Sequence, residues 1–365
     1  MYRLGRPGND NIRSAEYSEI EAVMIRTNEL QTSPGPGFLR FLVVLLGGLA
    51  FATVANTGST ADGEWPALQI VNVNELPYDE APRFGAKSKT FFRSDKGTFI
   101  HAKWSPTWGT EMRSGGMGSH YHLWNEWAYI LKGDLVIQEP VSPYQRNGAM
   151  YRYVQGTWLD RPPYTLHGGG WATGGLRSQN PNTLILFEEG DGSVVTVGPN
   201  GKHYKPDFPE EPDPYEPDWQ AVEQFGRPWI VDSGSALEWE QDPVVAGRLL
   251  KWLSDDEKEG FRARLVKIPP GWSAPEGSQK SYFDQADRMR YVLYGDMLVW
   301  QFDDPAAAGT PVRVSEDFYI HQSPRSIWGY GAGPVTEEGA VWLEVTYARG
   351  LEHGGGPIED AIAIQ

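Results

Sequence analysis

Short runs of alternating apolar and polar residues follow one another through most of the chain. Residues 98–104 alternate in this way, and residues 127–139 give two such runs around a Lys-Gly-Asp turn. Strand-like runs recur at 150–154, 182–188 and 194–197, and Gly and Pro separate them. Period-two alternation is typical of strands with one buried face, and helix-length amphipathic runs are scarce, so the pattern predicts an all-β protein. Many short strands with frequent turns are typical of a sandwich or a barrel.

One continuous apolar run, residues 41–55, interrupts this pattern near the N-terminus and follows Arg40. It is shorter than the roughly 20 residues that span a bilayer, so we expect no stable membrane span. Its length and the small residues at its end are typical of a signal-peptide core, and the alternative is an N-terminal strand packed on a barrel. A signal core predicts a periplasmic or secreted protein, and otherwise we expect a cytoplasmic one. Residues 1–61 are therefore treated as an N-terminal segment that includes a candidate signal or anchor.

A stretch dense in proline and acidic residues, 201–218, separates two similar halves of the chain. Proline donates no backbone hydrogen bond and like charges repel, so this stretch predicts an extended surface linker. After it, Tyr-Ile-Leu-Lys-Gly-Asp-Leu at 129–135 recurs as Tyr-Val-Leu-Tyr-Gly-Asp-Met at 291–297. Two further pairs of segments share this offset of about 161 residues, which indicates a duplication. The predicted domains are an N-terminal barrel at 62–200, a linker at 201–229 and a C-terminal barrel at 230–365.

The composition narrows the classes of partner. A formal net charge of −16 argues against nucleic acid and anionic membrane surfaces. The absence of cysteine excludes disulfides, thiolate catalysis, thiolate zinc sites and iron–sulfur clusters. The expected partner is therefore a small-molecule substrate. A homo-oligomer stays open, because the second barrel can instead act as an internal partner of the first.

Histidine and glutamate side chains gather in two segments of the first half. His120, His122 and Glu126 lie at offsets of two and four, which on one β-strand places them on the same face. His167 lies in a second, glycine-rich segment and would add a third imidazole from a second strand. Imidazole and carboxylate together suit a divalent ion such as Fe, Mn, Zn, Ni or Co. The pattern thus predicts one metal site.

The spacing of these residues resembles the two sequence motifs of the cupin family. His-x-His, a Glu four residues later and a Gly seven residues further on resemble the first motif. The second motif is similar to Gly156, Pro162 and His167. The resemblance implies two tandem cupin barrels, which are double-stranded β-helix or jelly-roll barrels. It also implies metal-ligand roles for His120, His122, Glu126 and His167.

The second repeat lacks the same set of ligands. At nearly the same offset, the four positions hold Tyr282, Asp284, Arg288 and Trp328. A guanidinium and an indole do not bind metals, so we expect the second barrel to be metal-free. It would then act as a structural partner, with Tyr282 and Trp328 filling the space of the lost site.

Three histidines and one carboxylate leave two positions open on an octahedral ion, whereas a tetrahedral ion would be nearly closed. A redox ion such as Fe(II) can bind a chelating substrate and O2 there, and a redox-silent ion can polarise a carbonyl or activate water. By analogy with the family, we expect an Fe(II) dioxygenase that acts on a small aromatic or keto acid. The alternatives are a non-redox lyase, isomerase or decarboxylase acting on a small acid, and a ligand-binding cupin without turnover.

Three residues near the second motif are candidates for a catalytic role. Arg152 and Arg161 flank the motif and would pair with a substrate carboxylate, unless they are simply exposed at the surface. Tyr164 would serve as a hydrogen-bond donor or proton carrier beside the metal. Tyr164 and Trp171 also mark departures from the second motif, since the family usually has Gly and Asn at these places.

Overall fold

The computed structural model describes residues 65–81, 86–93, 97–104, 120–139, 149–168, 180–190, 194–196, 226–256, 260–276, 280–348 and 361–364. Within these ranges, no helix is long and apolar enough to cross a membrane. The apolar run 41–55 and the acidic linker 201–218 lie outside the described residues. Export, the linker conformation and the domain boundaries therefore stay predictions.

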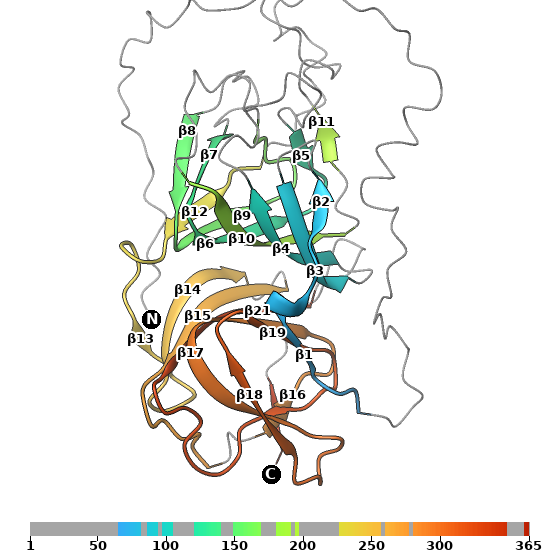
Figure 1. Ribbon diagram of the computed structural model, residues 1–365, viewed down its shortest axis with the longest axis vertical. Helices are drawn as coiled ribbons and strands as arrows, with labels where there is room; N and C mark the ends of the chain where they lie inside the picture. The colour runs from blue at the N-terminus through green and yellow to red at the C-terminus, as the bar shows by residue number, and fades with distance from the viewer. Residues whose placement is uncertain are drawn as a thin grey trace, which may run out of the picture. The chain divides into compact units, whose positions relative to one another are not determined.

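The described part of the chain is built almost wholly from antiparallel strands, as the alternation predicts (Figure 1). One 3-10 turn, η1 (Val73–Glu75), is its single helical element within the described ranges. The strands of the first half are β1 (Gln69–Asn72), β2 (Asp79–Ala81), β3 (Ala86–Arg93), β4 (Gly97–Trp104), β5 (His120–His122), β6 (Glu126–Lys132), β7 (Asp134–Glu139), β8 (Ala149–Val154), β9 (Thr157–Arg161), β10 (Asn182–Glu189) and β11 (Val194–Thr196).

The second half repeats this succession. Its strands are β12 (Trp229–Asp232), β13 (Glu240–Gln241), β14 (Leu249–Asp256), β15 (Phe261–Ile268), β16 (Lys280–Tyr282), β17 (Asp287–Gln301), β18 (Thr310–Ser315), β19 (Phe318–Gln322), β20 (Trp328–Gly329), β21 (Ala340–Tyr347) and β22 (Ile362–Ala363). The long strand β17 corresponds to β6 and β7 together, because its first part pairs with β21 and its second part with β18.

Equivalent strands pair in the same order in both halves. The first half contains the succession β3-β4-β10-β6-β9, and the second contains β14-β15-β21-β17-β19. The short strands agree as well, since β5 pairs with β11 as β16 pairs with β22. The duplication inferred from the sequence thus extends to the sheet topology.

The two halves exchange one strand each. β1 belongs to the first half of the sequence, yet it pairs with β19 of the second half through the register Gln69↔His321 to Asn72↔Phe318. β12 begins the second half, yet it pairs with β9 of the first half. Each barrel is therefore completed by the strand that the other half supplies.

Three hydrophobic clusters follow from the alternation along the strands. On β6, Ala128 and Ile130 belong to a cluster inside the first barrel. Trp127 and Tyr129, which alternate with these residues along β6, face a second cluster that contains residues of both halves. There the Trp127 ring stacks on Phe261 of β15 with ring centroids 3.7 Å apart. A third cluster fills the second barrel, so one face of each central sheet lines a barrel and the other packs between the barrels.

Candidate metal centre

His120 and His122 lie on strand β5, and His167 lies in the segment just before Gly168, which pairs with β5. The backbone N–H of His120 donates to the carbonyl oxygen of His167, and the N–H of His167 donates to the carbonyl oxygen of His120, both at 2.9 Å. These two bonds form an isolated antiparallel bridge, which fixes two segments that lie far apart in sequence. His122 lies two residues beyond His120, so its side chain leaves the strand on the same face.

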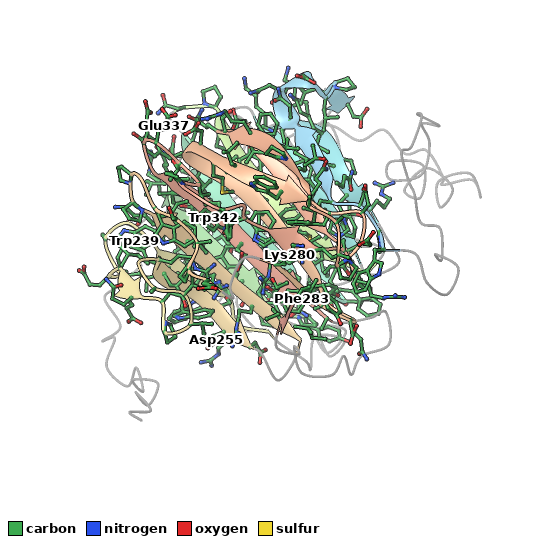
Figure 2. All side chains as sticks on the ribbon, turned by 90° about the horizontal axis from the view of Figure 1, so that it is seen from below. Trp239, Asp255, Lys280, Phe283, Glu337 and Trp342 are labelled. Carbon is green, nitrogen blue, oxygen red and sulfur yellow. The ribbon has the colours of Figure 1, made fainter. Side chains whose placement is uncertain are left out.

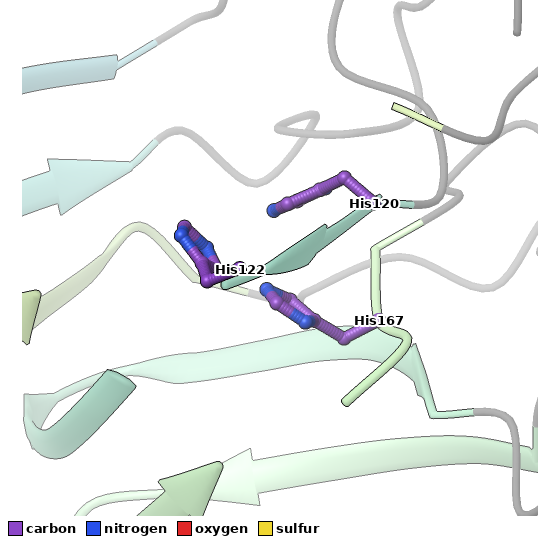
Figure 3. Close-up of side chains that lie close together, drawn as sticks. All are labelled: His120, His122 and His167. Atoms are coloured by element: carbon purple, nitrogen blue, oxygen red, sulfur yellow. The ribbon is translucent and has the colours of Figure 1, made fainter. Parts of the chain in front are cut away.

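The three imidazoles point toward one another (Figure 3). The ring centroids of His120 and His167 are 4.2 Å apart, and the His122 ring lies 5.4 Å from each of them. One ring nitrogen from each histidine lies within 4.8 Å of the others, which is a spacing that a single metal ion can bridge. All three residues are buried.

Glu126 begins β6 and brings its carboxylate to the same cluster. Its Oε2 lies 2.8 Å from Nε2 of His122 and 3.4 Å from Nε2 of His167. Its Oε1 accepts a hydrogen bond from Nη1 of Arg161 on the neighbouring strand β9. Burial raises the pKa of Glu126, but Arg161, His167 and His122 outweigh it and hold this pKa well below its usual value. The structure thus brings together all four residues predicted as ligands. The carboxylate among them, that of Glu126, is ionised.

The hydrogen bonds of the imidazoles test whether a cation fits. Nδ1 of His167 lies 2.9 Å from the carbonyl oxygen of Thr165, an acceptor, so Nδ1 carries the proton and Nε2 keeps its lone pair toward Glu126. Nε2 of His122 is buried and touches Glu126 at ion-pair distance, but it has no partner in hydrogen-bond geometry. An imidazole nitrogen that faces an ionised carboxylate at this distance needs a proton or a metal ion between the two atoms. Burial lowers the pKa of His122, but Glu126 outweighs it and raises this pKa, so the pair attracts positive charge. The donor set therefore fits a divalent metal ion.

Glu188 on β10 is a member of the site that the sequence analysis missed. Its carboxylate groups with His122 and Glu126 in a second set of atoms close enough to bind one ion. Burial raises the pKa of Glu188 to about 7, and the neighbouring Glu126 adds to this shift. Alternation on β10 could have revealed it, since Glu188 shares a face with the interior residues Leu184 and Leu186.

Arg161 is buried rather than exposed, and its guanidinium is already engaged. Besides Glu126, it binds Oε1 of Glu139, at 3.1 Å from Nε and 2.5 Å from Nη2. The hydroxyl of Tyr153 donates to the same oxygen at 2.8 Å. The expectation that Arg161 is exposed is therefore wrong, and its pairing with a substrate stays a prediction. In the structure Arg161 orients the carboxylate of Glu126.

The other two catalytic candidates lie away from the imidazoles. Arg152 on β8 is exposed and binds Asp134 at 2.8 Å across the β7–β8 hairpin, which matches the alternative of a surface position. Tyr164 donates its backbone N–H to the carbonyl oxygen of His122, while its ring packs against Tyr121. Because Tyr121 alternates with the histidines on β5, this ring lies on the opposite face of the strand. Tyr164 also has a φ of 65°, a conformation that favours glycine, which accounts for the Gly of the family motif at this place.

The counterparts in the second barrel have diverged in position as well as in chemistry. Trp328 is buried in the interior cluster, as predicted, whereas the half-buried ring of Tyr282 lies edge-on to Trp65 at 5.0 Å. Asp284 is exposed. Within the described ranges, both groups of side chains that could hold a metal lie in the first barrel.

Comparison with known proteins adds evidence on the fold. No family model matches the chain, and no curated protein matches its sequence. A candidate dioxygenase of Nostoc punctiforme is similar in structure over 82% of this chain and 87% of its own, with a TM-score of 0.51 and 12% identity. A cupin 2 conserved barrel domain protein of Leptotrichia buccalis covers 76% of this chain and 96% of its own, with a TM-score of 0.45 and 11% identity. A variant of the oxalate decarboxylase of Bacillus subtilis covers 84% and 81%, with a TM-score of 0.49 and 12% identity.

These identities bear on the fold alone, because one fold serves many activities. The chain folds as two tandem cupin barrels, that is, double-stranded β-helix or jelly-roll barrels, as the motifs and the repeat predict. Its first barrel contains a group of three histidines and a glutamate that could hold a metal ion.

Proposed function

We propose that the chain is a mononuclear metal-dependent enzyme with His120, His122, Glu126 and His167 as its protein ligands. The convergence of three buried imidazoles on one ionised carboxylate carries this proposal. A binding module without turnover has no need of such a site, because an organic ligand can be held by hydrogen bonds and apolar contacts alone.

Within this class, the proposed reaction is an Fe(II)-dependent dioxygenation of a small aromatic or keto acid. His120, His122, Glu126 and His167 would hold the Fe(II) ion, which would supply O2 activation next to a chelating substrate. The fold similarity to a candidate dioxygenase is consistent with this choice and does not establish it. Mn, Zn, Ni and Co suit the same ligands, so the metal is part of the test.

The chain's own residues supply the positioning of the site. Arg161 fixes Glu126 from behind, through Nη1, and is itself fixed by Glu139. The carbonyl oxygen of Thr165 holds the proton of His167 at Nδ1, which leaves Nε2 available as a ligand. Such outer contacts orient ligands and typically affect metal affinity about 10–100-fold.

A non-redox reaction, by a decarboxylase, lyase or isomerase of a small acid, is the second candidate. Glu188 favours it, because its half-buried carboxyl lies in the same cluster as His122 and Glu126. A carboxyl group beside the ligands could accept a proton from a bound substrate and return it, which is the requirement for general acid–base catalysis.

Metal reconstitution separates the two candidates. We expect protein loaded with Fe(II) to consume O2 with one member of a panel of aromatic and keto acids, and protein loaded with Mn(II) to consume none. The matched control is His167→Ala, which should consume no O2 with either metal. Metal-dependent release of CO2 or an isomerised product without O2 uptake would instead support the second candidate. Turnover by the His167→Ala variant at the wild-type rate would contradict the proposed site.

A further inference from the structure

A row of charged side chains crosses the interior of the second barrel. Arg264 on β15 lies opposite Glu344 on β21, which in turn lies opposite Arg290 on β17. In the first barrel, the equivalent places of the same register hold Ile100, Leu186 and Ala128. An apolar row of the first barrel has thus become ionic in the second.

Both carboxylate oxygens of Glu344 accept hydrogen bonds from the arginines of this row. Arg264 donates to its Oε1 from Nε at 2.8 Å and from Nη2 at 2.5 Å, and Nε of Arg290 donates to Oε2 at 2.9 Å. Arg290 has partners at all three of its nitrogens, because both of its Nη atoms also bind Oε1 of Gln322 and its guanidinium lies 3.6 Å from the ring centre of Trp328. Both partners of Glu344 are thus held by protein contacts.

Arg288 differs from its neighbours, because the end of its guanidinium has no hydrogen-bond partner in the part of the chain that the structure describes. It stands at the place of Glu126, on the barrel face of β17. Its Nε donates to Oγ1 of Thr346 at 3.2 Å and lies 3.9 Å from Oε1 of Glu344. Neither Nη atom makes a hydrogen bond to a described residue. Phe283, labelled in Figure 2, covers one face of the guanidinium at 4.2 Å.

The charges around Arg288 do not balance. Arg264, Arg288 and Arg290 share the single carboxylate of Glu344, so two positive charges remain in excess. The side chain of Arg288 is only 15% exposed, and burial followed by the nearby arginines lowers its pKa well below the usual value, against the pull of Glu344. An uncompensated charge at such a place is costly unless a counter-ion joins it.

Both residues that lie opposite Arg288 on the neighbouring strands are neutral, and Asp284, at the place of His122, is exposed. Glu188 of the first barrel corresponds to Thr346, and Arg161 corresponds to Gln322. The carboxamide oxygen of Gln322 already accepts from Arg290. At the place where the first barrel has the carboxylate of Glu126, the second barrel therefore has the guanidinium of Arg288, which attracts an anion instead of a cation.

We propose that the second barrel binds a small organic oxyanion, a carboxylate or a phosphate, through the two Nη atoms of Arg288. The planar guanidinium offers two parallel N–H donors, which match two oxygens of one carboxylate or phosphate group. Phe283 orients the guanidinium, and the excess of two positive charges at Arg264, Arg288 and Arg290 favours a dianion.

Isothermal titration calorimetry of the full chain with succinate and with inorganic phosphate, at constant ionic strength, tests the proposal. We expect one of the two anions to bind with one site per chain, and the choice identifies the carboxylate or the phosphate as the ligand group. Arg288→Gln should weaken the dissociation constant about tenfold or more, because a charge-assisted fork is lost. The matched control Arg313→Gln removes an exposed arginine that pairs with Asp296, and binding should be unchanged.

Two further measurements locate the anion. In the His167→Ala background the anion should still bind, because the site does not involve the first barrel. Without anion, Arg288→Gln should melt no lower than the parent, since it removes a charge that its neighbours repel. The proposal is overturned if neither anion binds, if binding survives Arg288→Gln, or if binding is lost in His167→Ala. A marked fall in the melting temperature of anion-free Arg288→Gln would likewise overturn it and make Arg288 a structural ion-pair partner.

Discussion

In the first barrel, Glu126 of β6 faces Arg161 of β9, while in the second barrel Arg288 of β17 faces Gln322 of β19. The backbone register around both places is the same, and each lies in a barrel that contains its own cluster of buried apolar side chains. The first barrel gathers carboxylates and imidazoles there, whereas the second gathers guanidiniums. One scaffold thus presents a group of side chains that could hold a cation and, in the proposal above, a site for an anion.

The duplicated halves share the pairing register of their strands rather than the identity of their side chains. Substitutions at a few inward positions of the central strands reverse the local charge without altering strand pairing. This separation is expected where a sheet face is set by period-two alternation, because a single side chain can change while its neighbours keep their places.

The largest expected effect comes from removing a ligand of the first barrel. His120→Ala or His167→Ala should lower bound metal from about one ion per chain to near zero, because each removes one of three imidazoles. Elemental analysis of protein purified without added metal measures the ratio and identifies the ion. Circular dichroism should be unchanged, since the bridge between the two segments is made by backbone atoms.

The matched controls lie in the second barrel. Asp284→Ala and Arg288→Gln should leave metal content unaltered, because neither residue belongs to a group that could hold an ion. A second ion per chain that disappears in Asp284→Ala would break the comparison between the barrels. Full metal occupancy in both histidine variants would refute the assignment of the ligands.

A second effect separates a positioning arginine from a surface arginine. Arg161→Leu leaves Glu126 and Glu139 buried without their partner, so we expect it to cost about 3–5 kcal/mol of unfolding free energy. The same change should weaken metal binding about 10–100-fold. Urea unfolding of metal-free protein and a metal titration measure the two losses.

Arg152→Leu is the control for this change, because the side chain of Arg152 is exposed and its partner Asp134 keeps a hydrogen bond from the backbone N–H of Asn180. Its cost should lie within about 0–1 kcal/mol, with metal affinity unchanged. Equal costs for the two variants would show that the buried pairs of Arg161 contribute nothing specific.

The smallest effect concerns the packing between the barrels, where His101 of β4 corresponds to Leu265 of β15. Burial lowers the pKa of His101 to about 4, and its Nδ1 has no hydrogen-bond partner among the described residues. Because protonation is disfavoured in the folded state, stability is complete above about pH 6.5 and declines toward pH 4. His101→Leu should remove up to about 3 kcal/mol of this decline, as seen in unfolding curves at pH 7 and pH 4. A variant with the same loss of stability as the parent between these pH values would exclude His101 as the cause.

Local alternation predicted most of the first barrel. The runs at 98–104, 182–188 and 194–197 correspond to β4, β10 and β11, and the turn within 127–139 separates β6 from β7. The four predicted ligands also meet in space, but the single strand predicted for three of them is wrong. Only His120 and His122 share β5, whereas Glu126 reaches the cluster from the start of β6 and the bridge adds His167. The strands themselves depend on short-range periodicity, which a sequence displays directly.

The remaining features depend on contacts between distant strands. Alternation on β15 marks Arg262 and Arg264 as one face, and arginines in such a pattern ordinarily indicate solvent, so the burial of Arg264 against Glu344 was not predictable. Arg161 was misplaced for the same reason, since its partner Glu139 lies on another strand. The partners of β1 and β12 are likewise invisible, because a strand of four residues carries no signal for which sheet it joins.

The reciprocal placement of β1 and β12 makes each half of the gene insufficient by itself. A polypeptide that stops before β12 would leave the edge of β9 open, and one that starts after β1 would leave β19 open, and such edges invite aggregation. Two fragments produced in the same cell would have to associate before β1 and β12 could pair with their partner strands. A truncation that removed the second half of the chain would therefore also remove β12, the strand that pairs with β9 of the first barrel.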